Sequence, residues 1–371
     1  MREREKIAMA STGKRLGFFT RLLDDGPAAE RYRLGAEQIL CAERCGYDGA
    51  WVAQHHFHEH EGGLPSPFVF LSYVAARTSR IRLGTGVVTL PLEAPVRVAE
   101  DAAVLDLMSG GRLEIGVGSG STATSFAAFG QESGQRGPVF GRHLSILRDA
   151  WAGHELGDPD NHLYPERPSL LDRIWQATFS VEGGRRAGEA GDGLMLSRTQ
   201  PRPADAPKAT LWDIQNPIID AYMAALPPGR APRIVGSRSV FVADSRDEAR
   251  RLADLGLRLA VERLVALGQP YPGDSLDERI AAYDVHVGTP DDVIASLKED
   301  TALRRTTDFA FQVHSVDPPH AATLHSIELV AAEVAPALGW VRSASPAALA
   351  HPARMRDVRR AEPDRLAGGT R

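Results

Sequence analysis

Two adjacent histidines follow a short apolar run, and their type and position make them the first candidates for chemistry in this chain. His55 and His56 come directly after the run Trp51 to Gln54, and His58 and His60 lie just beyond them. An imidazole at a strand end can act as an acid, a base or a hydrogen-bond donor at neutral pH. The cluster is also compatible with a histidine-rich loop that only faces solvent.

A metal site is a third interpretation, because His56 and His58 have the His-x-His form of zinc-dependent barrel hydrolases. Such a site needs further ligands from later strands, and the fifth and sixth predicted strands end in a serine and an arginine. Only His314 and Asp317, near the last predicted strand, offer suitable side chains. We therefore expect no metal.

Glycines interrupt two predicted strands at positions where side chains would normally pack. Gly84 and Gly86 lie in a stretch rich in Val and Thr, and Gly116, Gly118 and Gly120 end the following strand. Glycine weakens a strand unless another group must approach the backbone closely. Tight packing between strands and a planar cofactor across the strand ends are both possible reasons. The second run is not a G-x-G-x-x-G fingerprint, so it does not support Rossmann-type binding.

A possible anion site follows the fifth predicted strand. Ser180 precedes a helix that contains Gly183 and Gly184, and the unpaired N–H groups and dipole of a helix start favour a phosphate. Ser119 and Arg198 end neighbouring strands and could contribute a hydroxyl and a charge. The alternative is an ordinary N-cap followed by solvated arginines.

The elements that would position these residues alternate between strand and helix along the chain. Alternation of this kind implies parallel strands, because each return crossover needs a helix. Eight units favour a closed (β/α)8 TIM barrel as a single domain at 14–340, with its site at the C-terminal ends of the strands. The predicted strands are 16–20, 49–54, 81–90, 113–117, 174–180, 193–197, 233–243 and 308–314.

Two insertions and two tails depart from this pattern. Segments of about 153–172 and 268–300 are insertions, and long insertions on barrels often form lids. Residues 1–13 form a charged N-terminal tail, and 341–371 are rich in Arg, Ala and Pro and are expected to be disordered.

The composition excludes several classes of protein. The 371 residues are 43% hydrophobic and 25% charged with a net charge of -5, so nothing indicates binding to nucleic acid or to an anionic membrane. No apolar run approaches the roughly 20 residues that span a bilayer. The N-terminus lacks the apolar core of a signal peptide, so a cytoplasmic location is expected.

With these residues in hand, the chain resembles the bacterial luciferase-like family of flavin-dependent monooxygenases from about Leu16 to Trp340. The blocks that carry the resemblance are Gly46 to Phe57, Leu83 to Pro91 with Pro95 to Asp101, and Leu105 to Leu113. More narrowly, Leu194 to Arg198 resembles a subgroup of FMN-dependent luciferase-like monooxygenases.

The resemblance implies a barrel that takes reduced FMN as a co-substrate and uses O2 to oxygenate a small organic molecule. The ring would lie inside the mouth, with its phosphate near strands four and five. His55 matches the catalytic histidine of the family and His56 its neighbour, and the Gly86–Val87 bond matches a site where relatives have a cis peptide beside the flavin. The expected cofactor-binding residues are Gln54, Thr85, Gly86, Val87, Gly118, Ser119, Ser180, Gly183, Gly184 and Arg198.

Departures from luciferase itself narrow this expectation. Gln54 replaces an acidic residue, so light emission is not expected. Ser119 stands where luciferase has an arginine on the phosphate, Phe179 where it has an acidic residue, and Gly118 where it has a cysteine. Phosphate binding would then depend on Ser180, the glycine amides after it and Arg198.

The resemblance also implies partners. A separate reductase would supply reduced FMN, because the sequence contains no second nucleotide fingerprint, and relatives commonly form homodimers through early helices. Two alternatives use the same barrel. One is a hydride-transfer enzyme that uses the deazaflavin coenzyme, because the Arg- and Ala-rich composition is typical of sources where that coenzyme occurs. The other is a barrel that binds flavin without catalysing a reaction.

Overall fold

The structure is a computed structural model that describes residues 13–266, 271–313 and 318–342. The predicted tails at 1–13 and 341–371 lie almost entirely outside these ranges, as do His314 and Asp317, and the statements made about them stay predictions. None of the helices in the described ranges combines the length and the hydrophobicity that a membrane-spanning helix needs.

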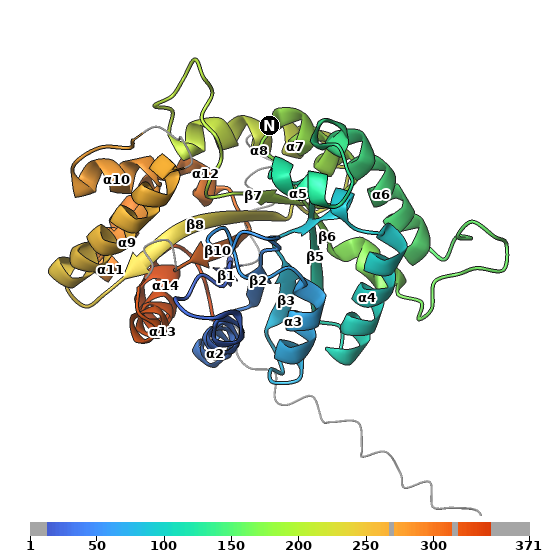
Figure 1. Ribbon diagram of the computed structural model, residues 1–371, viewed down its shortest axis with the longest axis horizontal. Coiled ribbons are helices and arrows are strands. Elements are labelled where there is room, and N and C mark those ends of the chain that lie inside the picture. The colour runs from blue at the N-terminus through green and yellow to red at the C-terminus, as the bar shows by residue number, and fades with distance from the viewer. Residues whose placement is uncertain (1–12, 267–270, 314–317, 343–371) are drawn as a thin grey trace, which may run out of the picture.

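Eight parallel strands close into a barrel, which confirms the predicted TIM-barrel fold (Figure 1). β10 pairs with both β1 and β8, and this double pairing closes the ring. The barrel strands are β1 (Arg15–Thr20), β2 (Gly49–Val52), β3 (Arg82–Thr85), β5 (Leu113–Gly118), β6 (Ile174–Ala177), β7 (Gly193–Leu196), β8 (Ile234–Val242) and β10 (Asp308–Gln312).

Helices surround the barrel on its outer side (Figure 1). Two of them begin with a proline, Pro67 and Pro95, and Gly46, with a φ of 94°, ends the first in the left-handed region. The main helices are α2 (Ala28–Cys45), α3 (Pro67–Ala75), α4 (Pro95–Met108), α6 (Arg136–Trp151), α7 (Val181–Glu189), α8 (Leu211–Ala225), α9 (Arg246–Ala266) and α13 (His320–Leu329).

The segment predicted as one strand at 81–90 is divided in two. β3 ends at Thr85, and the short strand β4 (Val88–Thr89) follows and also pairs with β5. Between them lies the Gly86–Val87 peptide, which is cis, as the resemblance implied. The interruption lies at the C-terminal end of the barrel, where both Gly86 and Val87 face the mouth.

The insertion predicted at 268–300 is a folded unit where the structure describes it. It contains α10 (Leu276–Ala282), β9 (Val285–Gly288) and α11 (Pro290–Glu299). β9 pairs with the C-terminal half of β8, whose N-terminal half belongs to the barrel. The insertion therefore extends the sheet from one long strand.

The insertion predicted at 153–172 is anchored at the opposite end of the barrel. It ends in a 3-10 helix (Pro168–Arg173), and Arg167 and Arg173 both bind the fully buried Asp106. Charge pairing of this kind satisfies a carboxylate that burial alone would strongly disfavour.

Large side chains fill the interior of the barrel below the mouth. Trp51 and Trp175 meet edge to face with ring centroids 5.6 Å apart. A Cβ at Gly84 would lie 2.2 Å from the Trp51 ring, and one at Gly193 would lie 2.1 Å from the Trp175 ring. The glycine at position 84 therefore serves interior packing, and the room it leaves belongs to a tryptophan rather than to a ligand.

Candidate active site

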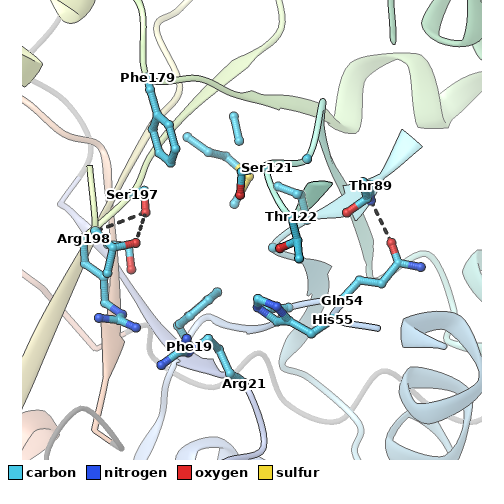
Figure 2. Close-up of a pocket in the computed structure, with 18 of the residues that line it drawn as sticks. Phe19, Arg21, Gln54, His55, Thr89, Ser121, Thr122, Phe179, Ser197 and Arg198 are labelled. Atoms are coloured by element: carbon cyan, nitrogen blue, oxygen red, sulfur yellow. Dashed lines mark hydrogen bonds between the residues drawn. The ribbon is translucent and has the colours of Figure 1, made fainter. Parts of the chain in front are cut away.

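A cavity of about 250 Å³ opens at the C-terminal ends of the barrel strands (Figure 2). Most of its lining comes from the segments after β1, β2, β3, β5, β6 and β7, as expected for the catalytic end of such a barrel. Of the residues predicted for the site, six line it: Gln54, His55, His56, Gly86, Val87 and Arg198. The others, Thr85, Gly118, Ser119, Ser180, Gly183 and Gly184, are not among the lining residues.

His55 faces the cavity from the end of β2 (Figure 2). Its backbone N–H donates to the carbonyl of Leu64 at 3.0 Å, which fixes the loop that returns after it. A Cβ at Gly62 would lie 2.5 Å from Cδ2 of the imidazole, so the ring occupies space that only a glycine leaves. Burial lowers the pKa of His55 below its ordinary 6.5, and the charges of Arg21 and Arg198 lower it further. The imidazole is therefore neutral at pH 7.

The carboxylate of Glu61 acts on the pKa of His55 in the opposite direction to burial. Its Oε2 lies 3.8 Å from Nδ1 of His55 and accepts a hydrogen bond from Thr122 Oγ1 at 3.2 Å. The carboxylate raises the pKa of His55, but not enough to offset burial. Sequence reasoning missed Glu61 and Gly62, because both lie in the loop after the histidine cluster and only the return of that loop brings them to the ring.

His56 lines the same cavity but packs against aromatic rings. Its imidazole meets the Phe129 ring edge to face at a centroid distance of 4.8 Å and lies 5.8 Å from the Phe57 ring. Its Nε2 is buried and has no hydrogen-bond partner among the described residues. Burial, and after it the neighbouring His55, lower the pKa of His56, so this imidazole is also neutral.

Gln54 joins three segments at the edge of the cavity. Its side-chain amide donates to Glu93 Oε1 at 2.6 Å and to the Pro65 carbonyl at 3.1 Å, and its oxygen accepts from the Thr89 N–H at 2.7 Å (Figure 2). All of these contacts are within the protein. Gln54 thus holds the chain around the cis peptide in place.

The inner wall of the cavity is mostly apolar. Gly86 and Val87 contribute from one side, and Ala177 and Met195 from the strands opposite. The predicted residue Thr85 instead exchanges hydrogen bonds with the backbone of Gly116 between β3 and β5.

Gly118 also contributes through packing rather than as part of the lining. A Cβ at this position would lie 2.8 Å from Val87 Cγ2, so the glycine leaves room for that side chain. In this way Gly118 allows Val87 to form part of the cavity wall.

A polar rim continues from the cavity along the loop after β5. Gly120, Ser121 and Thr122 line the cavity, while Ser119 is half-buried just behind them. Gly120 has a φ of 74°, which permits the turn that brings these groups to the edge. The rim presents the hydroxyl groups of Ser121 and Thr122 to the cavity. The arginine that luciferase has at this point of the chain is replaced here by Ser119.

Phe179, two residues before the start of α7, lines the same cavity as the rim. Ser180 is exposed, and its Oγ accepts a hydrogen bond from the Gly183 N–H at 3.1 Å, so it is the N-cap of the helix. Gly183 and Gly184 are buried: a Cβ on the first would lie 1.9 Å from Thr178 Oγ1, and one on the second 2.6 Å from the Ile218 carbonyl. The two glycines therefore allow close packing of α7.

Arg198 reaches away from α7. It is only 8% exposed, and its Nε donates to Gln312 Oε1 at 2.6 Å while Nη1 donates to Ser239 Oγ at 3.2 Å. These partners lie on β10 and β8, so the structure brings Arg198 together with His55 and Arg21 rather than with Ser119 and Ser180. Sequence reasoning missed Arg21, because an arginine after the first strand carries no local signal of a site.

The described residues contain no group of three His, Cys, Asp or Glu side chains arranged to hold a metal ion. His58 Nε2 is 3.1 Å from Thr124 Oγ1, and the His58 and His60 rings lie 5.8 Å apart. His314 and Asp317, the other candidate ligands, lie outside the described residues.

Comparison with known sequences identifies a family that matches most of the chain. Residues 16–307 match the family model described as luciferase-like monooxygenase. The chain is similar to 4-hydroxyprotoasukamycin monooxygenase of Streptomyces nodosus subsp. asukaensis, with 31% identity over 69% of this chain and 73% of that one. It is also similar to limonene 1,2-monooxygenase of Rhodococcus erythropolis, with 28% identity over 81% and 80% of the two chains. An F420-dependent glucose-6-phosphate dehydrogenase of Amycolatopsis mediterranei is 31% identical over 43% of this chain and 52% of that one.

Solved structures agree on the fold. Monooxygenase RslO1 from Streptomyces bottropensis superposes with a TM-score of 0.70 at 24% identity, over 87% of this chain and 99% of that one. The oxygenating constituent of 3,6-diketocamphane monooxygenase of Pseudomonas putida, solved in complex with FMN, gives a TM-score of 0.66 at 19% identity, over 88% and 98% of the two chains. At these identities the likeness concerns the barrel itself.

Proposed function

The chain belongs to the luciferase-like monooxygenase family and is a flavin-type monooxygenase, and from this premise we propose that it uses reduced FMN and O2 to oxygenate a small organic substrate. The observation that carries the proposal is the position of His55, a neutral imidazole directed into an apolar-walled cavity at the catalytic end of the barrel. When bound, reduced FMN would supply the electrons that activate O2.

The described cavity suits a flat ring. Val87, Ala177 and Met195 form apolar surfaces on facing walls, and the buried Nε2 of His56 is a polar atom without a partner in the described ranges. The volume of about 250 Å³ is slightly below the roughly 300–1,000 Å³ typical of ligand pockets, which fits a ring inside and a polar tail at the mouth.

The tail of the coenzyme would follow the polar rim. We propose that its phosphate lies beside the loop Ser119 to Thr122 and the start of α7, where Ser180 and the first N–H groups of the helix are within the same region. The helix dipole favours an anion at this end. Gly183 and Gly184 would then act indirectly, by setting the position of the helix.

His55 would manage protons beside the ring. Glu61 faces Nδ1, which leaves Nε2 as the nitrogen available to a bound ligand. A neutral imidazole can accept a proton at Nε2 or, in the other tautomer, donate one there. The apolar wall around Val87 and the aromatic group around His56 would exclude water from the same space.

Two partners complete the proposal. A separate flavin reductase would deliver reduced FMN, since the sequence carries no second nucleotide-binding fingerprint. A second copy would pair through α3 and α4, which pack together and expose the large apolar side chains of Val69, Tyr73, Leu107 and Met108. An apolar face of this kind on adjacent helices is typical of a protein interface.

Isotope labelling tests the reaction. The purified protein, photoreduced FMN and 18O2 would be mixed with a panel of aldehydes, sulfonates and aromatic compounds, and products examined by mass spectrometry. We expect one labelled oxygen atom in a product. A barrel without catalysis would bind FMN and leave the rate of reduced-FMN oxidation unchanged by every compound.

The deazaflavin coenzyme is the specific competitor, because one relative is named as F420-dependent. Parallel fluorescence titrations with FMN and with this coenzyme separate the two. We expect tighter binding of FMN. Tighter binding of the deazaflavin, with hydride transfer and no labelled oxygen in the product, would replace the proposal.

A further inference from the structure

Two arginines border the candidate active site at the ends of β1 and β7. Arg21 and Arg198 both line the cavity that contains His55, and Figure 2 draws them across it from Thr89. Both also border a second cavity of about 1230 Å³, so the two cavities meet at these guanidinium groups. Two cations at such a junction attract a ligand that carries negative charge.

Arg198 is fixed in place without being neutralised. Its hydrogen bonds to Gln312 and Ser239 go to uncharged side chains, and no carboxylate of the described ranges forms an ion pair with it. Its Nη2 group makes no hydrogen bond within those ranges either. A guanidinium that is more than nine-tenths buried normally has a charged partner, and the described residues supply none to Arg198.

The nearby acidic groups are committed to other residues. Asp284 accepts two hydrogen bonds from Arg202, at 2.6 and 2.7 Å. Glu61 accepts from Thr122 and lies beside His55. Burial, and after it the charge of Arg21, lower the pKa of Arg198, and the charge of Asp284 raises it by less than they lower it.

The orientation of Arg198 separates it from the rim proposed for the coenzyme phosphate. Its partners are on β8 and β10, whereas the serine-rich rim follows β5 and β6. His55, at the end of β2, lies close enough to both arginines for their charges to lower its pKa. The arginines therefore face the side of the cavity where a substrate would meet the imidazole.

We infer that the substrate carries a carboxylate or sulfonate, that Nη2 of Arg198 binds this group with help from Arg21, and that the apolar remainder lies against Phe19 and the ring. This inference rests on the proposed function, because it assigns the space beside Arg21 and Arg198 to the substrate of that reaction. Planar, double N–H contacts to such oxyanions are the usual reason for an arginine rather than a lysine at a site.

Binding of simple probes tests the inference without turnover. Octanoate, octane-1-sulfonate and the uncharged octanamide would be titrated by calorimetry into the protein saturated with oxidised FMN. We expect both anions to bind about ten- to a hundred-fold more tightly than octanamide, the range of a charged hydrogen bond. Arg198→Met should remove this preference, Arg198→Lys should restore part of it, and Arg21→Met should reduce it. Arg97→Met, on the outer surface of α4, is the matched control and should change nothing.

Equal binding of octanoate and octanamide to the wild-type protein would overturn the inference. So would an anion preference that survives in both Arg198→Met and Arg21→Met. Circular dichroism and thermal unfolding check that each variant folds, and the Arg21 variant decides the question if Arg198→Met does not fold.

The coenzyme phosphate is the other possible anion, and riboflavin distinguishes it. If Arg198 binds the substrate, the preference for FMN over riboflavin stays the same in Arg198→Met. If that preference collapses while octanoate binding is unchanged, Arg198 serves the coenzyme and the inference is wrong. Titrating the same probes without coenzyme separates this outcome from failure of the proposed function, because an anion site can persist in a protein that never binds FMN.

Discussion

The two ends of the barrel treat charge in opposite ways. At the N-terminal end of the strands a space of only about 20 Å³ remains, and its charged groups are matched: Arg15 pairs with Asp308 at 2.7 Å and Arg82 with Glu114 at 2.5 Å. At the C-terminal end the cavity is about 250 Å³, and Arg198 there has no carboxylate partner in the described ranges.

The difference separates stability from function in one fold. Paired charges at the closed end satisfy buried groups and tie neighbouring strands together, as between β3 and β5. An arginine such as Arg198, without a carboxylate partner in the described ranges, and neutral imidazoles at the open end cost stability, and proteins retain such groups mainly where a ligand completes them. Substitutions at the open end should therefore change chemistry with little effect on folding, and substitutions at the closed end should do the reverse.

The largest effect is expected from His55→Ala. Losing the imidazole should lower the turnover of substrate with reduced FMN by about 10²- to 10⁴-fold, the usual contribution of a general acid or base. The melting temperature should stay close to that of the wild type, because the ring borders the cavity rather than the core. His154→Ala, with a histidine exposed to solvent away from the site, is the control. Turnover within two-fold of wild type would remove His55 from the mechanism.

Glu114→Ala should show the converse at the closed end. It leaves Arg82 and the Trp175 Nε1–H, which donates to Glu114 at 2.8 Å, without their carboxylate. We expect the free energy of unfolding in urea to fall by about 3 kcal/mol, as when one partner of a buried pair is removed. The affinity for FMN should be unchanged. Glu100→Ala breaks an exposed pair on α4 and should cost less than about 1 kcal/mol. Equal losses in the two variants would contradict the contrast between the ends.

The sequence alone predicts the barrel and the position of His55 at its C-terminal end. The alternation of strands and helices is a local pattern, so it identified the barrel and placed His55 at the end of β2 with the cavity beside it. Gly86 and Val87 were also located, through the resemblance. Such features depend on residues near one another in the chain.

The remainder of the site depends on contacts between distant segments, which no local pattern contains. From the sequence, Gly84 is compatible with tight packing or with room for a ligand, and only the structure shows that Trp51 from the neighbouring strand fills the space. Arg198 was assigned to the phosphate because it ends a neighbouring strand, yet its side chain turns toward Gln312 on β10. The direction of a long side chain is decided by its partners in space.

The pH dependence of activity offers a finer test of the open end. The pKa of His55 in the folded protein is lowered from 6.5. Its imidazole is therefore mostly neutral at pH 6.5 and above, and it becomes protonated only at a lower pH than a free histidine would. If the neutral form works, kcat/KM should decline on acidification with a midpoint below 6.5.

Two variants should move that midpoint in opposite directions. Glu61 raises the pKa of His55, so Glu61→Gln should shift the midpoint to lower pH. Arg21 lowers the pKa, so Arg21→Met should shift it to higher pH. Activity that increases on acidification would mean that the imidazolium is the working form.

The smallest effect is expected at Ser180, which would both stabilise α7 and bind the coenzyme phosphate. As the N-cap of α7 it accepts from the Gly183 N–H, so Ser180→Ala should lower the free energy of unfolding by about 1 kcal/mol. Thr289→Ala removes a comparable cap from α11, away from the cavity, and should cost a similar amount. Only Ser180→Ala should also weaken FMN relative to riboflavin, because the proposed phosphate lies at the start of α7. If both variants leave that ratio unchanged, Ser180 belongs to the stabilising part of the molecule alone, and the boundary between the two kinds of residue runs between α7 and the loop after β5.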